Sequence, residues 1–154
     1  MNLATILPPE AVIPLLPAQD KKHALKLMAA QAARLTGLSE REIFSVLLER
    51  EQIGCTGMGN GVCIPHGRFE ALKGLHAVFA RLERPIEFGA VDGRPVDLIF
   101  LLLTPKAANT EHLKALATIS RTLRDKQLCA ELRKTGDAAK LHALLVARRD
   151  DEAA

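Results

Sequence analysis

Residues 57–68 read GMGNGVCIPHGR, a run of glycines that ends at a proline–histidine pair. Successive backbone N–H groups in a glycine-rich turn form a concave site for negative charge. Pro65 has a fixed φ, so the backbone that enters His66 is stiff, and a neutral histidine with its ordinary pKa of about 6.5 is a nucleophile at pH 7. The pattern suits a histidine that carries a phosphoryl group beside the loop amides of Gly57, Gly59, Asn60 and Gly61. A tight turn without a ligand is the alternative interpretation of the glycines.

Phosphoryl transfer depends on positioning and on stabilisation of negative charge, so a cation is expected near the histidine. Arg50 and Arg68 are candidates, because a guanidinium holds phosphate oxygens through two parallel hydrogen bonds. His112 falls in the first turn of an expected helix, where the helix dipole favours anions. Taken alone, each of these three residues is more typical of a surface position. The remaining histidines are expected to be structural or surface residues: His23, His76 and His142.

Three other kinds of site fit this region less well. A dinucleotide-binding fingerprint needs a strand before the glycines and a helix after them, and here the expected order is reversed. A zinc site would combine Cys55, Cys63, His66 and His112, but no paired knuckle spacing is present and Pro65 makes the Cys63–His66 link rigid. Cys63 and His66 could also form a nucleophile and its base, although no third residue orients them. We therefore expect neither a metal nor an organic cofactor.

Two helices are expected before the glycines and would position Arg50. Asp20 can cap a helix that ends at Gly37, with apolar residues at three- and four-residue spacing between them. Ser39 begins a capping box for a second helix, which should run to about Glu51. Arg50 then lies in the last turn of this helix, just ahead of the glycine stretch.

The rest of the chain alternates between strand-like and helical patterns. Residues 62–64, 76–82 and 96–103 predict strands, and the third is apolar enough to be covered on both faces. Helices are expected behind a cap at Asn109 or Thr110, with Leu113 on the apolar face, and then over residues 126–134 and 137–146. Helices, strands and helices in this order predict a layered α/β sandwich.

We expect one domain over residues 1–154, because no linker or repeat divides the chain. Four prolines forbid a long helix in residues 1–19, which are expected to form an extended lead-in, and residues 148–154 a frayed tail. The net charge of +3 is mild and interspersed, and Trp and Tyr are both missing from the composition. These values argue against nucleic-acid binding. No apolar run reaches the ~20 residues of a membrane span, and three unpaired cysteines suggest a cytoplasmic protein.

The stretch EREQIGCTGMGNGVCIPHG, residues 49–67, closely resembles the active-site region of EIIA proteins of the bacterial phosphoenolpyruvate-dependent phosphotransferase system. It is similar to the fructose/mannitol class, including its nitrogen-regulatory branch. The similarity continues through PIEFGAVDGRPVDLIFLLLTP, residues 85–105, and TEHLKALATISRTLRDKQL, residues 110–128. The resemblance therefore covers nearly the whole chain, and it implies the family's fold, a mixed β-sheet flanked by helices.

The resemblance also implies a role for individual residues. His66 matches the histidine that accepts phosphate on Nε2 from a phosphohistidine of an HPr-like carrier (NPr). His112 matches a second active-site histidine, and Arg50 matches an arginine at the end of the preceding helix; both would stabilise the phosphate. Arg68 falls where the family often has lysine or another polar residue, so it stays outside the expected set.

Two branches of the family imply different outcomes for the phosphate. In the nitrogen-regulatory branch, the phosphorylation state changes binding to targets such as transporters or sensor kinases. In a sugar-transport EIIA, the phosphate passes on to a cysteine of an EIIB domain. The sequence ends at Ala154 without an attached EIIB, EIIC or HPr-like domain, which favours the regulator. We expect a phosphocarrier with no independent enzymatic turnover.

Overall fold

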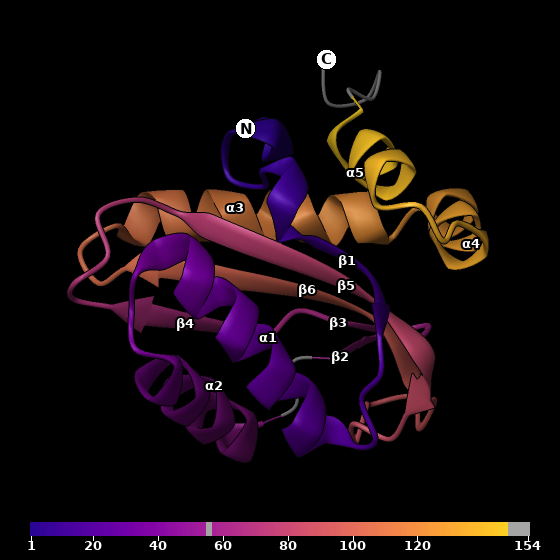
Figure 1. Ribbon diagram of the computed structural model, residues 1–154, viewed down its shortest axis with the longest axis horizontal. Helices are drawn as coiled ribbons and strands as arrows, with labels where there is room; N and C mark the ends of the chain where they lie inside the picture. The colour runs from indigo at the N-terminus through magenta and orange to yellow at the C-terminus, as the bar shows by residue number, and fades with distance from the viewer. Residues whose placement is uncertain (55–56, 148–154) are drawn as a thin grey trace.

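The computed structural model describes residues 1–54 and 57–147, which form a six-stranded mixed sheet with helices on both faces (Figure 1). The strands are β1 (Val12–Leu16), β2 (Gly57–Gly59), β3 (Val62–Cys63), β4 (His66–Phe69), β5 (His76–Ile86) and β6 (Val96–Pro105). The helices are α1 (Lys21–Thr36), α2 (Glu40–Ile53), α3 (Asn109–Leu123), α4 (Lys126–Lys134) and α5 (Ala138–Val146). The predicted layered α/β sandwich with a mixed, helix-flanked sheet is confirmed.

The sheet is built around β6, whose side chains are almost all buried. Its strand order is β1-β5-β6-β3-β2, and β4 also pairs with β6. β5 and β6 run antiparallel, whereas β3 and β4 both run parallel to β6 along its other edge. A strand covered by helices on both faces has to be apolar throughout, which explains the continuous apolar run predicted here.

Helices α1 and α2 pack against each other on one face of the sheet (Figure 1). The Asp20 side chain accepts a hydrogen bond from the His23 N–H at the start of α1, and Gly37, with a φ of 79°, ends that helix. Ser39 caps α2 in the same way. Both caps agree with the sequence prediction. Helix α2 carries Arg50 in its last turn and contacts β4.

The edge of β6 carries two short strands in place of one long strand. β3 lies opposite Leu98 and Ile99, and β4 begins with His66 opposite Leu102. Pro65 lies between them and has no N–H to donate to the ladder, although its carbonyl accepts from the Leu102 N–H at 2.9 Å. The interruption places His66 at the first position of a strand that the sequence analysis did not predict.

Helix α3 lies on the face of the sheet opposite α1 and α2, and its first turn lies at the same end of the sheet as the end of β6 (Figure 1). Its N-cap residue is Ala108, with no side-chain hydrogen bond to the helix. The predicted cap at Asn109 or Thr110 is therefore wrong. The side-chain oxygen of Asn109 instead accepts a hydrogen bond from Arg68 of β4, so this residue ties the helix to the strand.

The buried face of α3 also differs from the expected one. Leu113, predicted to face the core, has 64% of its surface exposed, whereas the neighbouring His112 is only 5% exposed. The amphipathic period of the helix is as predicted, but its rotation about its own axis is not. As a result, a histidine turns inward at the start of the helix.

Residues 1–19 form more than the predicted extended lead-in. They contain two short 3-10 turns, Leu3–Thr5 and Pro9–Ala11, and then β1, which pairs in parallel with β5. Pro14 is tolerated within β1 because this is an edge strand, where a missing N–H need not break the sheet. The tail expected at 148–154 lies outside the described residues. None of the described helices is long and apolar enough to cross a membrane.

Candidate functional site

An open cleft of about 430 Å³ lies where the last turn of α2, the start of β4 and the start of α3 meet. It is lined by Val46, Glu49, Arg50, Ile53, His66, Gly67, Arg68, Lys106 and His112. The structure therefore brings together His66, His112 and Arg50, three residues separated by up to 62 positions in the sequence.

His66 is fixed by the backbone just before it. Its Nδ1 lies 2.8 Å from the carbonyl oxygen of Ile64. A carbonyl oxygen only accepts hydrogen bonds, so Nδ1 must carry the proton and Nε2 keeps its lone pair. The rigid Pro65 between the two residues holds this geometry. The ring thus presents Nε2 as its nucleophilic atom.

The surroundings of His66 favour its neutral form. Burial lowers its pKa below 6.5, and the positive charges of Arg50 and Arg68 lower it further. The Ile64 carbonyl and the carboxylate of Glu51 act in the opposite direction, but the pKa stays lowered. The neutral ring, with a lone pair on one nitrogen, is therefore the favoured form of His66 at pH 7 and somewhat below.

His112 faces His66 from the first turn of α3. The two ring centroids are 5.6 Å apart, with the ring planes inclined at 58°. Nδ1 of His112 lies 2.7 Å from Oγ1 of Thr104, the penultimate residue of β6. Burial, with smaller effects of Arg68 and His66, lowers the pKa of His112 to about 4. Both histidines of the cleft are therefore neutral at pH 7.

The low pKa of His112 has a consequence for acid stability. The folded protein binds a proton on this ring near pH 4, whereas the unfolded chain does so near pH 6.5. Protonation thus favours the unfolded chain, and the contribution of His112 to stability is lost as the pH falls from 6.5 toward 4. We expect the ring resonances of His112 to titrate in NMR spectra with a midpoint near pH 4. A midpoint at or above 6.5 would contradict the buried, neutral assignment.

Positive charge surrounds the two histidines. Arg50 donates from Nη1 to the carbonyl of Gly54 at 3.1 Å, which holds its side chain along the end of α2. Arg68 bonds to Asn109 and lowers the pKa of both histidines. Lys106 adds a third cation to the lining of the cleft. Such a site suits a phosphoryl group, whose oxygens carry the negative charge during transfer.

Arg68 was left outside the expected set, and the structure places it in the cleft. Strand alternation would have found it if β4 had been predicted, because residues two apart in a strand point to the same face. His66 and Arg68 have this spacing in β4. Thr104 was also missed. It lies opposite Arg68 in the register of β4 and β6, and sequence reasoning had no means to predict that register.

Gly67 allows α2 to approach the strand that carries His66. A Cβ at this position would lie 2.7 Å from Cγ1 of Val46 in α2, and 3.3 Å from the ring of Phe69. Gly67→Ala should therefore force α2 away from β4 and lower the free energy of unfolding by about 1–3 kcal/mol, as overpacking typically does. Urea unfolding would measure this.

Gly74→Ala is the matched control, because nothing lies within 4 Å of a Cβ there. It should change the free energy of unfolding by no more than about 0.5 kcal/mol. Equal stability of the two variants would show that α2 does not depend on the close approach at Gly67.

The sequence analysis placed the amides of residues 57–61 at the phosphate, but none of these residues is in the lining of the cleft. Gly57 lies opposite Cys63 in the hairpin of β2 and β3. Beyond it, the Asn60 N–H donates to the Asp92 carboxylate at 2.8 Å, and the Gly61 carbonyl accepts from Leu98 of β6. His66 pairs four residues further along β6, about 13 Å away at ~3.3 Å per residue.

The turn at Gly59, Asn60 and Gly61 thus lies outside the cleft lining, and its role as a phosphate-binding loop stays a prediction. The turn does bind an anion, but that anion is Asp92 of the same chain, whose pKa is lowered by the backbone N–H groups of Asn60 and Arg94. The positive φ of all three residues, between 56° and 89°, is what the turn itself requires.

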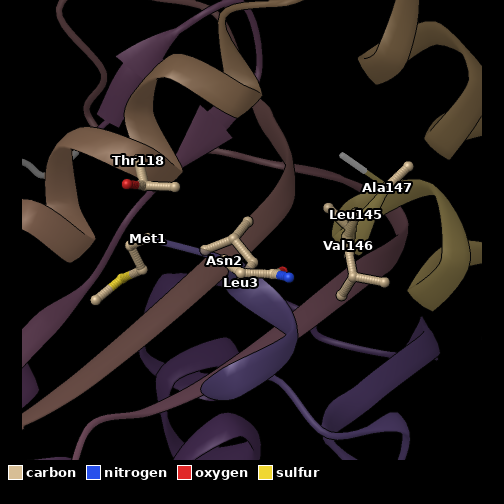
Figure 2. A pocket seen from close by; sticks show the side chains of 7 residues that line it. All are labelled: Met1, Asn2, Leu3, Thr118, Leu145, Val146 and Ala147. Carbon is tan, nitrogen blue, oxygen red and sulfur yellow. The ribbon is translucent and has the colours of Figure 1, made fainter. Parts of the chain in front are cut away.

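Two other features of the described structure bear on the choice of site. Within residues 1–54 and 57–147, no three His, Cys, Asp or Glu side chains are grouped to hold a metal ion; Cys55, one of the four weighed for zinc, lies outside them. A separate hollow of about 220 Å³ lies between the N-terminal turn, α3 and the end of α5 (Figure 2). Its lining includes Met1 and Val146, and its one hydroxyl, from Thr118, donates to the Lys114 carbonyl. The cleft at His66 is therefore the candidate site.

The chain is similar to several known proteins. The family described as "Phosphoenolpyruvate-dependent sugar phosphotransferase system, EIIA 2" matches residues 5–147. A nitrogen regulatory protein of Bradyrhizobium diazoefficiens is 49% identical over 145 residues, covering 94% of this chain and 95% of that protein. A fructose-specific EIIA component of Haloferax volcanii is 34% identical over 140 residues, covering 87% and 91%. The crystal structure of the nitrogen regulatory protein IIA-Ntr from Neisseria meningitidis matches with a TM-score of 0.88 at 34% identity, covering 93% of this chain and 98% of that one.

Proposed function

The chain belongs to the EIIA 2 family of the phosphoenolpyruvate-dependent sugar phosphotransferase system, and on this basis we propose that His66 accepts a phosphoryl group from an HPr-like phosphocarrier (NPr). One observation carries the proposal: the bond between His66 Nδ1 and the Ile64 carbonyl leaves Nε2 as a bare lone pair in a cationic cleft. The product is a phosphohistidine, so the protein acts as a carrier.

The transfer exchanges one P–N bond for another. Nε2 of His66 attacks the phosphorus on the donor histidine, and the P–Nε2 bond forms as the donor P–N bond breaks. The electron pair of the broken bond returns to the donor nitrogen. His66 keeps its proton on Nδ1 throughout, and the Ile64 carbonyl stabilises the positive charge that the ring gains. No external acid or base is needed at His66.

Negative charge on the phosphoryl oxygens is stabilised by the cleft. Arg50 and Arg68 approach from α2 and β4 and supply guanidinium donors. His112 approaches from α3 as a neutral ring, whose N–H can donate a hydrogen bond to a phosphoryl oxygen. Charge stabilisation by preorganised donors accounts for much of catalysis in phosphoryl transfer.

We propose that the phosphorylation state then regulates target proteins, such as transporters or sensor kinases. Nitrogen regulatory proteins are the relatives at 49% identity and at a TM-score of 0.88, which favours this branch. Addition of a phosphoryl group changes the charge of the cleft by roughly −1.5 to −2 at pH 7. The affinity of a partner that docks over the cleft would change with this charge.

The proposal is tested by incubating the chain with phosphoenolpyruvate, enzyme I and an NPr-type carrier. We expect one phosphate per chain, with the acid lability of a phosphohistidine and a ³¹P resonance typical of Nε2 substitution. Omission of the carrier is the control and should prevent labelling. A chain that takes up no phosphate in the complete mixture would contradict the proposed function.

The fructose-specific relative at 34% identity supports a second candidate function, a sugar-transport EIIA. To separate the two, the phosphorylated chain is mixed with a purified fructose-type EIIB that carries its acceptor cysteine. We expect the phosphate to stay on the chain, as in a regulator. Rapid appearance of phosphocysteine on the EIIB would establish the transport function instead.

A further inference from the structure

Thr104 contacts the ring of His112 from the end of β6. Its side chain is completely buried, and its Oγ1 lies 2.7 Å from Nδ1 of His112. His112 is itself 5% exposed, so water does not compete for this hydrogen bond. The contact joins the central strand of the sheet to the first turn of α3, where the cleft is formed.

The direction of this hydrogen bond follows from the protons of the two groups. The hydroxyl of Thr104 has one proton to donate, and within the described residues its hydrogen-bond partner is Nδ1 of His112. If Nδ1 carried a proton and donated it, the hydroxyl proton would be buried without an acceptor, which folded proteins avoid. If Nδ1 is bare, it accepts from the hydroxyl and both groups are satisfied.

We propose that Thr104 is a positioning residue that holds His112 as the Nε2–H tautomer. The proton on Nε2 can then be donated to an oxygen of the phosphoryl group on His66, in the cleft that both rings line. This inference rests on the proposed function, because it assigns the hydrogen bond a purpose in phosphoryl transfer.

The two histidines then have opposite tautomers. A backbone group sets the tautomer of His66, and a side chain sets that of His112. A carbonyl, that of Ile64, forces a proton onto Nδ1 of His66 and leaves Nε2 bare to attack phosphorus. A hydroxyl, that of Thr104, donates to Nδ1 of His112 and leaves Nε2 protonated. The first ring supplies the nucleophile and the second the hydrogen-bond donor. If a hydroxyl replaced the carbonyl beside His66, both rings would present a proton to the phosphate. If a carbonyl replaced the hydroxyl beside His112, both rings would present a lone pair.

Thr104→Val tests the inference, since it keeps the buried shape and removes the hydroxyl. In the unphosphorylated protein, ¹⁵N NMR of the imidazole should show a fall in the Nε2–H population of His112. Phosphoryl transfer to His66 should slow by about 3- to 10-fold, the factor that corresponds to one hydrogen bond. Thr104→Ser keeps the hydroxyl and should restore both the tautomer and the rate.

Thr118→Val is the matched control, because it also removes a nearly buried hydroxyl, one that donates to a backbone carbonyl within α3. It should leave both readouts unchanged. An unaltered tautomer in Thr104→Val, or a rate that Thr104→Ser does not restore, would overturn the inference. The NMR measurement needs no phosphate, so the two proposals can fail separately. A wild-type chain that is never labelled refutes the proposed function. A wild-type chain that is labelled, with an unaltered tautomer in Thr104→Val, refutes only the role of Thr104.

Discussion

Replacement of His66 by glutamine is expected to abolish phosphorylation of the chain. Loss of a nucleophile lowers a transfer rate by about 10³-fold or more, so the variant should show only background labelling by phosphoenolpyruvate, enzyme I and carrier. No other described side chain of the cleft can take over. His112 is the other imidazole of the cleft, but its Nδ1 contacts Thr104 and its Nε2 carries the proposed proton.

The matched control is His23→Gln, at the start of α1, where the ring accepts a hydrogen bond from the Gln19 N–H outside the cleft. This variant should be labelled at the wild-type rate. Thermal unfolding of both variants checks that neither has lost its fold. If His66→Gln were labelled within tenfold of the wild-type rate, or if the label moved to another histidine, the assignment of His66 would be wrong.

Local chemistry along the chain pointed to His66, and the structure places this residue in the cleft with its ring bonded to the Ile64 carbonyl. The caps at Asp20 and Ser39 were also predicted correctly from the sequence, because capping depends on residues within one turn of each other. Arg50 follows from the second cap, since the length of α2 places it in the last turn beside β4. These features need no knowledge of which distant segments meet.

The glycine loop shows why the position of more distant residues could not be predicted from the sequence. Its sequence is that of a turn that binds an anion, and it does bind one. The identity of that anion depends on Asp92, 32 residues away, whose carboxylate accepts the Asn60 N–H. The register of β3 along β6 then directs the turn away from His66. Neither the partner nor the register is encoded in the local pattern.

The rotation of α3 illustrates the same limit at the second histidine. An amphipathic period predicts that a helix has a buried face, but the packing of the helix against the sheet decides which residues that face contains. Here Leu113 is exposed and His112 is buried. The buried ring contacts Thr104, a residue that no spacing rule connects with His112. The family resemblance supplied His112 where the physical pattern alone pointed to a surface residue.

His112→Ala is expected to slow phosphoryl transfer to His66 by about 10²-fold, the cost of losing one preorganised donor to a developing anion. His66 itself would remain neutral and bound to Ile64, since its largest pKa effect is its own burial. The nucleophile would be intact but the phosphoryl oxygens would lose one donor. Single-turnover transfer from the phosphorylated carrier measures the effect, and His112→Gln should recover part of the rate through its amide N–H.

A loss of rate could also arise from destabilisation, because His112→Ala removes the ring that the buried Thr104 hydroxyl contacts. An unpaired buried group costs about 1–3 kcal/mol. Thr118→Ala separates the two causes: it loosens the same helix through a nearly buried hydroxyl but leaves the cleft lining unchanged. If Thr118→Ala slowed transfer as much as His112→Ala does, the effect would belong to the stability of α3. A slow His112→Ala variant beside a fast Thr118→Ala variant would place the ring of His112 against the phosphoryl group itself.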